Sequence, residues 1–125
     1  MTERNTKILF SLAAAFNFMA CLIFLEPLGL AAAFNLSHSV GGDPLAQIML
    51  MAVFLFGVGY WLVPGNPTEY RGVVILGLIG KIGVVTITFS HYFFVGDVNI
   101  NLASLTLGDV IFAALFFRYL KATTG

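Results

Sequence analysis

Polar side chains interrupt three of the long apolar stretches in this sequence, and they do so at similar depths. Lys81 lies ten residues after Arg71, which places it ~15 Å along a helix from that arginine. Asp109 lies nine residues before Arg118, or ~13 Å by the same rise per residue. Asn17 occupies a corresponding position in the first apolar stretch. We therefore expect the three side chains to share one level of the molecule.

A lysine and an aspartate at this depth are expected to meet. A lone charge of this kind at the centre of a bilayer costs ~3 kcal/mol on insertion scales. We therefore predict that Lys81 and Asp109 form an intramembrane ion pair or a hydrogen-bonded neutral pair. The amide of Asn17 is able to donate and accept, and so to complete the network. Two roles remain open: the pair fixes helix register, or it belongs to a functional site.

Thr88 extends this predicted cluster. It lies seven residues after Lys81, on the same face of a helix. The spacing predicts an intramembrane polar cluster of Asn17, Lys81, Asp109 and Thr88. The alternative is that the threonine hydroxyl bonds to a carbonyl of its own helix. The same stretch has a glycine at every third position, which predicts a smooth strip for close helix approach: Gly77, Gly80 and Gly83.

A second group of titratable residues lies in or beside the opposite connections. Histidine and carboxylate side chains are ligands for zinc, iron or copper. The candidate metal ligands are His38, His91, Glu26 and Asp43. They show no His-x-x-His or Glu-x-x-His spacing, so the alternative is that they are solvated or capping groups. The sequence does not indicate a particular cofactor.

The composition identifies the class of protein. Of 125 residues, 59% are apolar and 10% are charged, with no formal net charge, whereas soluble domains carry about 25% charged residues. This composition excludes a disordered chain and a nucleic-acid binder with a basic face. The single cysteine, Cys21, excludes a disulfide scaffold. A polytopic membrane protein, with the lipid bilayer as its first partner, is the remaining class.

Four stretches supply the ~20 apolar residues that a helix needs to cross the membrane. They cover residues 7–26, 44–63, 71–94 and 102–120, and prolines, glycines or charges bound each of them. The first is longer than the core of a signal peptide, so we expect a span there. We predict an all-α polytopic membrane protein, with residues 1–125 forming one antiparallel bundle of four transmembrane helices. The apolar segment 28–36 is too short to cross and is predicted to lie at the interface.

The distribution of lysine and arginine predicts the orientation. The connections at 27–43 and 95–101 contain neither residue. Under the positive-inside rule, both termini and the 64–70 turn are then cytoplasmic. Aromatic residues fall at the same boundary, where membrane-interface belts are found: Tyr60, Trp61, Tyr70 and Tyr119.

Short motifs spread over most of the chain resemble those of small bacterial four-helix inner-membrane proteins, loosely DoxX-like. The matching pieces are, in order, Ala14-Ala15-Phe16-Asn17, Ala46-Gln47, Gly57-Val58-Gly59-Tyr60, Pro67, Arg71, Gly77-Leu78-Ile79-Gly80-Lys81 and Gly108-Asp109-Val110-Ile111-Phe112. The resemblance implies a four-span topology and the association of Asn17, Lys81 and Asp109. It implies no activity.

The sequence favours a non-enzymatic role. About 80 helical residues leave little internal volume, and the connections are too short for a soluble active site. The first hypothesis is an accessory subunit or binding module of a larger membrane assembly, with other chains or copies of itself as partners. The second is an oligomeric proton-linked transporter that uses Lys81 and Asp109. The third, the weakest, is a subunit of a metal-dependent oxidoreductase.

Overall fold

The computed structural model describes residues 2–25, 28–34 and 44–123, and every regular element in these ranges is a helix. Four helices are long: α1 (Glu3–Phe24), α3 (Pro44–Leu62), α4 (Arg71–Ser90) and α5 (Ile100–Ala122). Three elements are short: α2 (Leu30–Ala33), the 3₁₀ turn η2 (Val63–Gly65) and the π-helical turn η3 (His91–Val95). The prediction of an all-α protein is confirmed.

Helix α1 begins earlier than expected because the residues before it form a cap. The Thr2 hydroxyl accepts a hydrogen bond from the Asn5 N–H at 3.1 Å, and Glu3 places a negative charge in the first turn. The helix stops after Phe24, and Leu25 is extended with a ψ of 115°. A helix ends ahead of a proline for steric reasons, and Pro27 follows two residues later.

The remaining helix ends also follow local chemistry. Pro44 opens α3, where its missing N–H removes no helical hydrogen bond. Beyond α4, the turn η3 carries the helical path to Val95, and Gly96 then takes a left-handed conformation with a φ of 82°. Asn99 caps α5 by accepting a hydrogen bond from the Leu102 N–H at 2.9 Å. The last two helices therefore lie close to the spans expected at 71–94 and 102–120.

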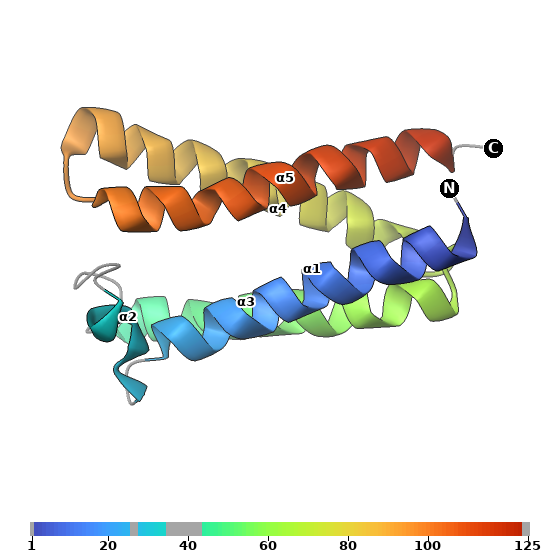
Figure 1. The fold of residues 1–125 in the computed structure, drawn as a ribbon, viewed down its shortest axis with the longest axis horizontal. Helices are drawn as coiled ribbons and strands as arrows, with labels where there is room; N and C mark the ends of the chain where they lie inside the picture. Colours follow the sequence, from blue (N-terminus) through green and yellow to red (C-terminus); the bar gives the residue numbers. More distant parts are fainter. Residues whose placement is uncertain (1, 26–27, 35–43, 124–125) are drawn as a thin grey trace.

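The four long helices lie along a common direction as two pairs (Figure 1). Helix α1 packs along α3, and α4 packs along α5, whereas fewer contacts join the two pairs. Successive long helices run in opposite senses along the molecule, so both chain termini lie at the same end. The short α2 lies at the other end. We call these the terminal end and the α2 end.

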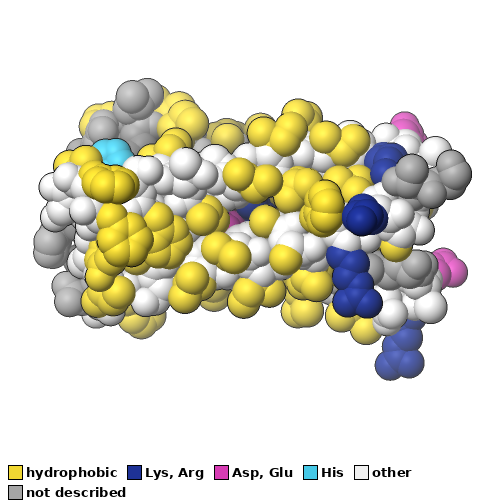
Figure 2. Space-filling view, turned by 90° about the horizontal axis from the view of Figure 1, so that it is seen from above, with side chains coloured by type: hydrophobic (Ala, Val, Ile, Leu, Met, Phe, Trp, Pro, Cys, Tyr) yellow, Lys and Arg dark blue, Asp and Glu magenta, His cyan; other side chains and the backbone are white. Residues whose placement is uncertain are grey.

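Each long helix is long and apolar enough to cross a membrane, over Glu3–Phe24, Gln47–Gly65, Arg71–Val95 and Ile100–Ala122. Large apolar side chains cover the outside of the molecule, and basic side chains gather at the terminal end (Figure 2). Ile48, Leu76 and Ile111 are each about 60% exposed or more. Such a surface matches hydrocarbon rather than water.

Four aromatic side chains form the tightest part of the core, near the terminal end. Phe10 of α1 lies against Phe116 and Tyr119 of α5, with ring centroids 5.3 and 4.9 Å apart, and Tyr60 of α3 lies 5.1 Å from Phe116. We call Phe10, Tyr60, Phe116 and Tyr119 the aromatic layer. Tyr60 and Tyr119 are only 2% exposed, so these two of the aromatic residues predicted at the boundary face the interior of the bundle. Their rings fill the interior, whereas Trp61 is 64% exposed.

Polar side chains tie the helices of each pair together. Arg71, at the start of α4, donates to the Leu120 carbonyl at 3.0 Å and to the Thr123 hydroxyl at 2.6 Å. A cation at this position also opposes the negative end of the α5 dipole. In the other pair, the Gln47 amide donates to the Phe24 carbonyl at 2.9 Å.

The glycines of α4 differ in what faces them. A methyl group on Gly77 would collide with the Tyr60 ring and hydroxyl, so only glycine allows this approach of α3 to α4. A methyl group on Gly80 or Gly83 would meet nothing within 4 Å. The expected strip of three closely packed glycines was therefore wrong for Gly80 and Gly83, because no described residue of another helix lies close to either position.

Candidate functional site

Lys81 and Asp109 meet at mid-length between α4 and α5. The Lys81 ammonium nitrogen lies 2.8 Å from Oδ1 of Asp109. The exposed fractions of the two side chains are 6% and 17%, so the pair is largely removed from solvent. The predicted contact is confirmed. It follows from helical geometry, because two polar groups in adjacent packed helices avoid the surrounding apolar surface by facing each other.

Asn17 joins the pair from α1. Its Nδ2 donates to the Val53 carbonyl of α3 at 3.0 Å, which turns its Oδ1 toward Lys81 at 3.5 Å. The amide is therefore held by one helix pair while it accepts from the other. Through Asn17, Lys81 and Asp109, side chains of α1, α4 and α5 meet the backbone of α3 at one level.

Four aromatic rings lie within about 6 Å of the ammonium group. The Lys81 nitrogen lies 5.2 Å from the centroid of the Phe16 ring and 5.4 Å from that of Phe112. The rings of Tyr60 and Phe116 lie 5.8 and 6.0 Å away. A cation within about 6 Å of an aromatic ring is attracted to the electron-rich face, most strongly where water is absent. These rings therefore place electron-rich faces beside the contact between Lys81 and Asp109.

A cavity of about 540 Å³ extends from this pair toward the α2 end. All four predicted cluster residues line it, including Thr88, which does not contact Lys81 directly. The rest of the wall is mainly apolar and comes from all four long helices: Phe16, Ala20, Phe24, Met49, Leu50, Ala52, Val53, Phe56, Tyr60, Gly77, Gly80, Val84, Leu102, Leu105 and Thr106. The polar cluster is thus the polar lining of an otherwise apolar chamber.

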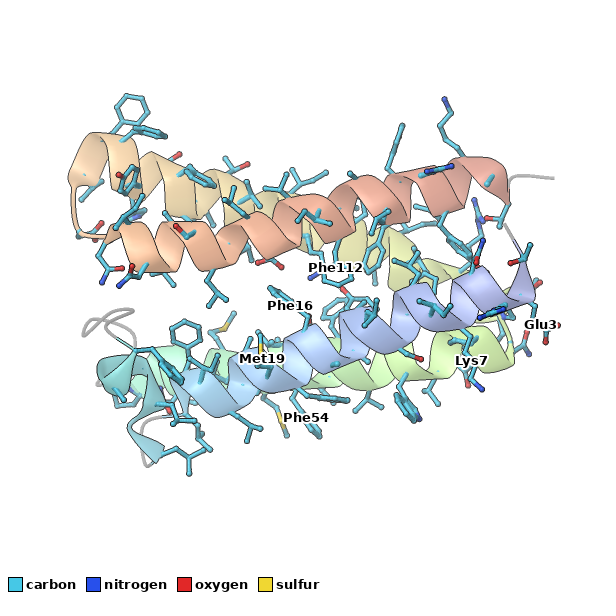
Figure 3. The ribbon with its side chains drawn as sticks, viewed as in Figure 1. Glu3, Lys7, Phe16, Met19, Phe54 and Phe112 are labelled. Atoms are coloured by element: carbon cyan, nitrogen blue, oxygen red, sulfur yellow. The ribbon has the colours of Figure 1, made fainter. Side chains whose placement is uncertain are left out.

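Clusters of packed side chains lie toward both ends of the cavity. The aromatic layer bounds it toward the terminal end, and Phe24 with Ala31 of α2 forms a second small core at the α2 end. Phe16 of α1 and Phe112 of α5 point toward each other across the gap between their helices, with ring centroids 5.4 Å apart (Figure 3).

The exposed members of the lining all belong to α3 and α4. They are Met49, Ala52, Gly80 and Val84. Among the described residues, the most exposed part of the lining therefore lies between α3 and α4, on the lateral surface of the molecule, and we take it as the mouth of the cavity. A molecule that enters by this route approaches from the side of the helices that carries apolar residues.

The hydroxyl groups near the cavity behave in two ways. Thr86 and Thr106 donate to carbonyls of their own helices, at 2.8 and 3.0 Å. This is the arrangement that was the alternative for Thr88. The Thr88 hydroxyl makes no hydrogen bond to another residue in the described part of the chain. Thr88 thus contributes a polar group to the cavity wall.

Of the four predicted metal ligands, the structure describes only His91. His91 lies at the exposed α2 end and bonds through Nδ1 to Asp97 at 2.9 Å. His38, Glu26 and Asp43 lie outside the described residues. Within residues 2–25, 28–34 and 44–123, no three histidine, cysteine or carboxylate side chains are placed to hold a metal ion.

Sequence reasoning missed the aromatic residues around Lys81. A signal for two of them was present, because Phe112 and Phe116 lie three and seven residues after Asp109 and so share its helix face. Phe16 precedes Asn17 directly, and its position could not be deduced without the crossing of α1 and α5. The lateral mouth depends on the packing of two helix pairs and has no counterpart in the sequence.

Compared with models of known families, with curated proteins and with solved structures, the chain matches none. The resemblance to DoxX-like proteins therefore stays a prediction, and the function is argued from the geometry alone.

Proposed function

We propose that this chain is a non-catalytic binding module of a membrane, which holds a lipid-soluble small molecule in the cavity beside Lys81 and Asp109. The observation that carries the proposal is a cavity with apolar walls and a lateral mouth, in which Asn17, Lys81 and Asp109 form a polar floor. Its volume of about 540 Å³ lies within the range of ~300–1,000 Å³ typical of small-molecule sites. Such sites combine apolar walls with a few polar groups that orient the ligand.

The proposal includes a membrane arrangement. We place the chain in a bacterial inner membrane as an antiparallel bundle of four spans, with α2 in an interfacial segment and both termini in the cytoplasm. Basic residues at the terminal end support this orientation: Arg4, Lys7, Arg71, Arg118 and Lys121. Fluorescent protein fused to the C-terminus should then fluoresce, whereas alkaline phosphatase fused there should be inactive. The reverse pattern contradicts the orientation.

Purification in mild detergent tests the binding role. The protein should retain a lipid-soluble molecule detectable by native mass spectrometry. Gly80→Leu places a side chain at the mouth of the cavity, where nothing lies within 4 Å, and should deplete that molecule. Gly83→Leu is the matched control, because Gly83 is equally uncovered but does not line the cavity. Retention that is equal in the two variants contradicts entry through this mouth, and the absence of any retained molecule in the unmodified protein contradicts the binding role.

Association with other chains belongs to the same proposal. Apolar side chains on the outside, such as Leu76, Ile79 and Ile87 of α4, are each more than half exposed. They offer a surface for a neighbouring membrane protein or for a second copy. A protein that elutes as a monomer without any other chain, after gentle extraction, counts against the accessory-subunit role while leaving ligand binding intact.

A second function, proton-linked transport, has one specific observation in its favour. The cavity reaches two ionisable side chains, Lys81 and Asp109, at the depth where a coupling site is needed. The aromatic layer bounds the cavity toward the terminal end, so transport requires this layer to open. Lys81→Met should abolish proton flux in reconstituted vesicles under this hypothesis, and unchanged proton flux eliminates it.

A further inference from the structure

The shape of the cavity restricts what it can hold. Its lining on α4 runs from Gly77 to Thr88, eleven residues further along the chain, which corresponds to ~16 Å along the helix axis. The same length is covered on α3 between Met49 and Tyr60. A volume of about 540 Å³ spread over this length makes a narrow chamber parallel to the helices. A single hydrocarbon chain suits it better than a lipid with two chains.

The charge of the cavity restricts the ligand further. Lys81 and Asp109 neutralise each other, and the other residues that line the chamber carry no charge. An anionic or cationic ligand would add an uncompensated charge to a space largely removed from water, which is unfavourable. A neutral molecule avoids this cost.

The pair still offers hydrogen bonds to a neutral ligand. Asp109 uses Oδ1 for Lys81, and no other described residue donates to its carboxylate. The Lys81 ammonium has three N–H groups, of which two point toward Asp109 and Asn17. One acceptor and one donor therefore lie side by side at the floor, and a hydroxyl group satisfies both at once.

From these three restrictions we infer that the cavity binds a neutral single-chain alcohol, or a molecule of the same form, that enters from the bilayer between α3 and α4. Its hydroxyl donates to Asp109 and accepts from Lys81, its chain extends along the cavity toward Phe24, and the end of a chain longer than the cavity passes out through the mouth. The inference rests on the proposed binding function and adds the class of ligand and its route.

Photolabelling in phosphatidylcholine vesicles tests the inference. The probe is a 16-carbon alcohol that carries a diazirine in its chain, and the competitors are 1-hexadecanol, hexadecanoic acid and hexadecane. Labelled peptides should contain cavity residues such as Ala20 and Leu105. 1-Hexadecanol should compete about tenfold better than the other two, because only it forms the pair of hydrogen bonds without adding a charge.

Variants separate the two parts of the inference. Gly80→Leu should suppress labelling of the cavity, whereas Gly83→Leu should leave it unchanged. In the double variant K81M/D109L, which has no charge at the floor, labelling should persist while 1-hexadecanol and hexadecane compete equally.

The outcomes distinguish this inference from the function on which it rests. If hexadecanoic acid or hexadecane competes as well as 1-hexadecanol in the unmodified protein, the class of ligand is wrong but the cavity still binds. If equal labelling of the cavity persists in Gly80→Leu and Gly83→Leu, the lateral route is wrong. If the probe labels no cavity residue at all, both the inference and the proposed binding function are overturned.

Discussion

The two halves of the molecule are built from the same four helices but are filled differently. Toward the terminal end, Phe10, Tyr60, Phe116 and Tyr119 are at most 2% exposed and pack ring against ring. Toward the α2 end, the side chains of the four helices leave a cavity of about 540 Å³. The interior of the first half is filled by aromatic rings, whereas the interior of the second half keeps open space.

The ion pair lies on the border between these halves. Tyr60 and Phe116 belong to the aromatic layer and also face the Lys81 ammonium, whose partner Asp109 lines the cavity. The comparison shows how a closely packed region can fix the position of a polar pair that also lines a neighbouring cavity. The following predictions test this division, beginning with the largest effect.

Removing the lysine should cause the largest loss of stability. Lys81→Met leaves Asp109 without its cation in a largely buried position, which costs about 3–5 kcal/mol in the free energy of unfolding. Unfolding in mixed detergent micelles, followed by circular dichroism, measures this loss. The double variant K81M/D109L should recover a large part of it, because no charge is then left unpaired. Equal losses in the single and double variants would show that the two groups are not coupled.

Truncating a side chain should cost more stability in the closely packed half than in the half that holds the cavity. Phe116→Ala should cost about 3 kcal/mol, since it opens a hole in a region that is completely filled. Leu105→Ala should cost about 1 kcal/mol, because this side chain is only partly buried and already faces the cavity. The same unfolding measurement compares them. A Leu105 variant as unstable as the Phe116 variant contradicts the contrast in packing.

Adding a methyl group should affect stability differently at two glycines of α4, one that is covered and one that is not. Gly77→Ala forces a carbon against the Tyr60 ring and should destabilise the protein by about 2 kcal/mol. Gly80→Ala meets nothing within 4 Å and should be neutral or stabilising by up to about 1 kcal/mol, because alanine favours the helix. Melting temperatures in the same detergent give the comparison. A shift of equal sign and size in both variants would contradict the assigned positions of α3 and α4.

The tie at the terminal end should have the smallest effect. Arg71→Lys keeps the charge but loses the fork that reaches both the Leu120 carbonyl and the Thr123 hydroxyl. The expected loss is about 1 kcal/mol, because these bonds lie at a partly exposed helix end. The change should appear as faster hydrogen exchange in the last turn of α5. Unchanged hydrogen exchange there would show that these hydrogen bonds of Arg71 do not stabilise the end of α5.

Much of the fold was predictable because apolar length and helix breakers act locally. The four spans appear in the sequence as stretches long enough to cross a bilayer, and Pro44 and Asn99 stand at helix starts. The contact between Lys81 and Asp109 was predictable for a different reason, since two buried charges at one depth are unfavourable unless they meet.

The shape of the site was not predictable in this way. The cavity exists because the α1–α3 pair and the α4–α5 pair meet closely at Tyr60 and Gly77 but less closely beyond Lys81. This depends on how side chains from four helices fit together. The regular spacing of the three glycines also does not distinguish Gly77, which Tyr60 covers, from Gly80 and Gly83, where an added methyl group would meet nothing within 4 Å.

The central claim is that Lys81 and Asp109 are in direct contact, at the floor of the cavity. Solid-state NMR on protein in lipid bilayers, with ¹⁵N at lysine Nζ and ¹³C at aspartate Cγ, measures this contact by dipolar dephasing. The account predicts strong dephasing that matches a nitrogen–oxygen contact of 2.8 Å and that disappears in Asp109→Asn, in which Cγ is unlabelled. Absence of dephasing in the unmodified protein would mean that the two side chains point apart, and it would contradict both the site and the function proposed for it.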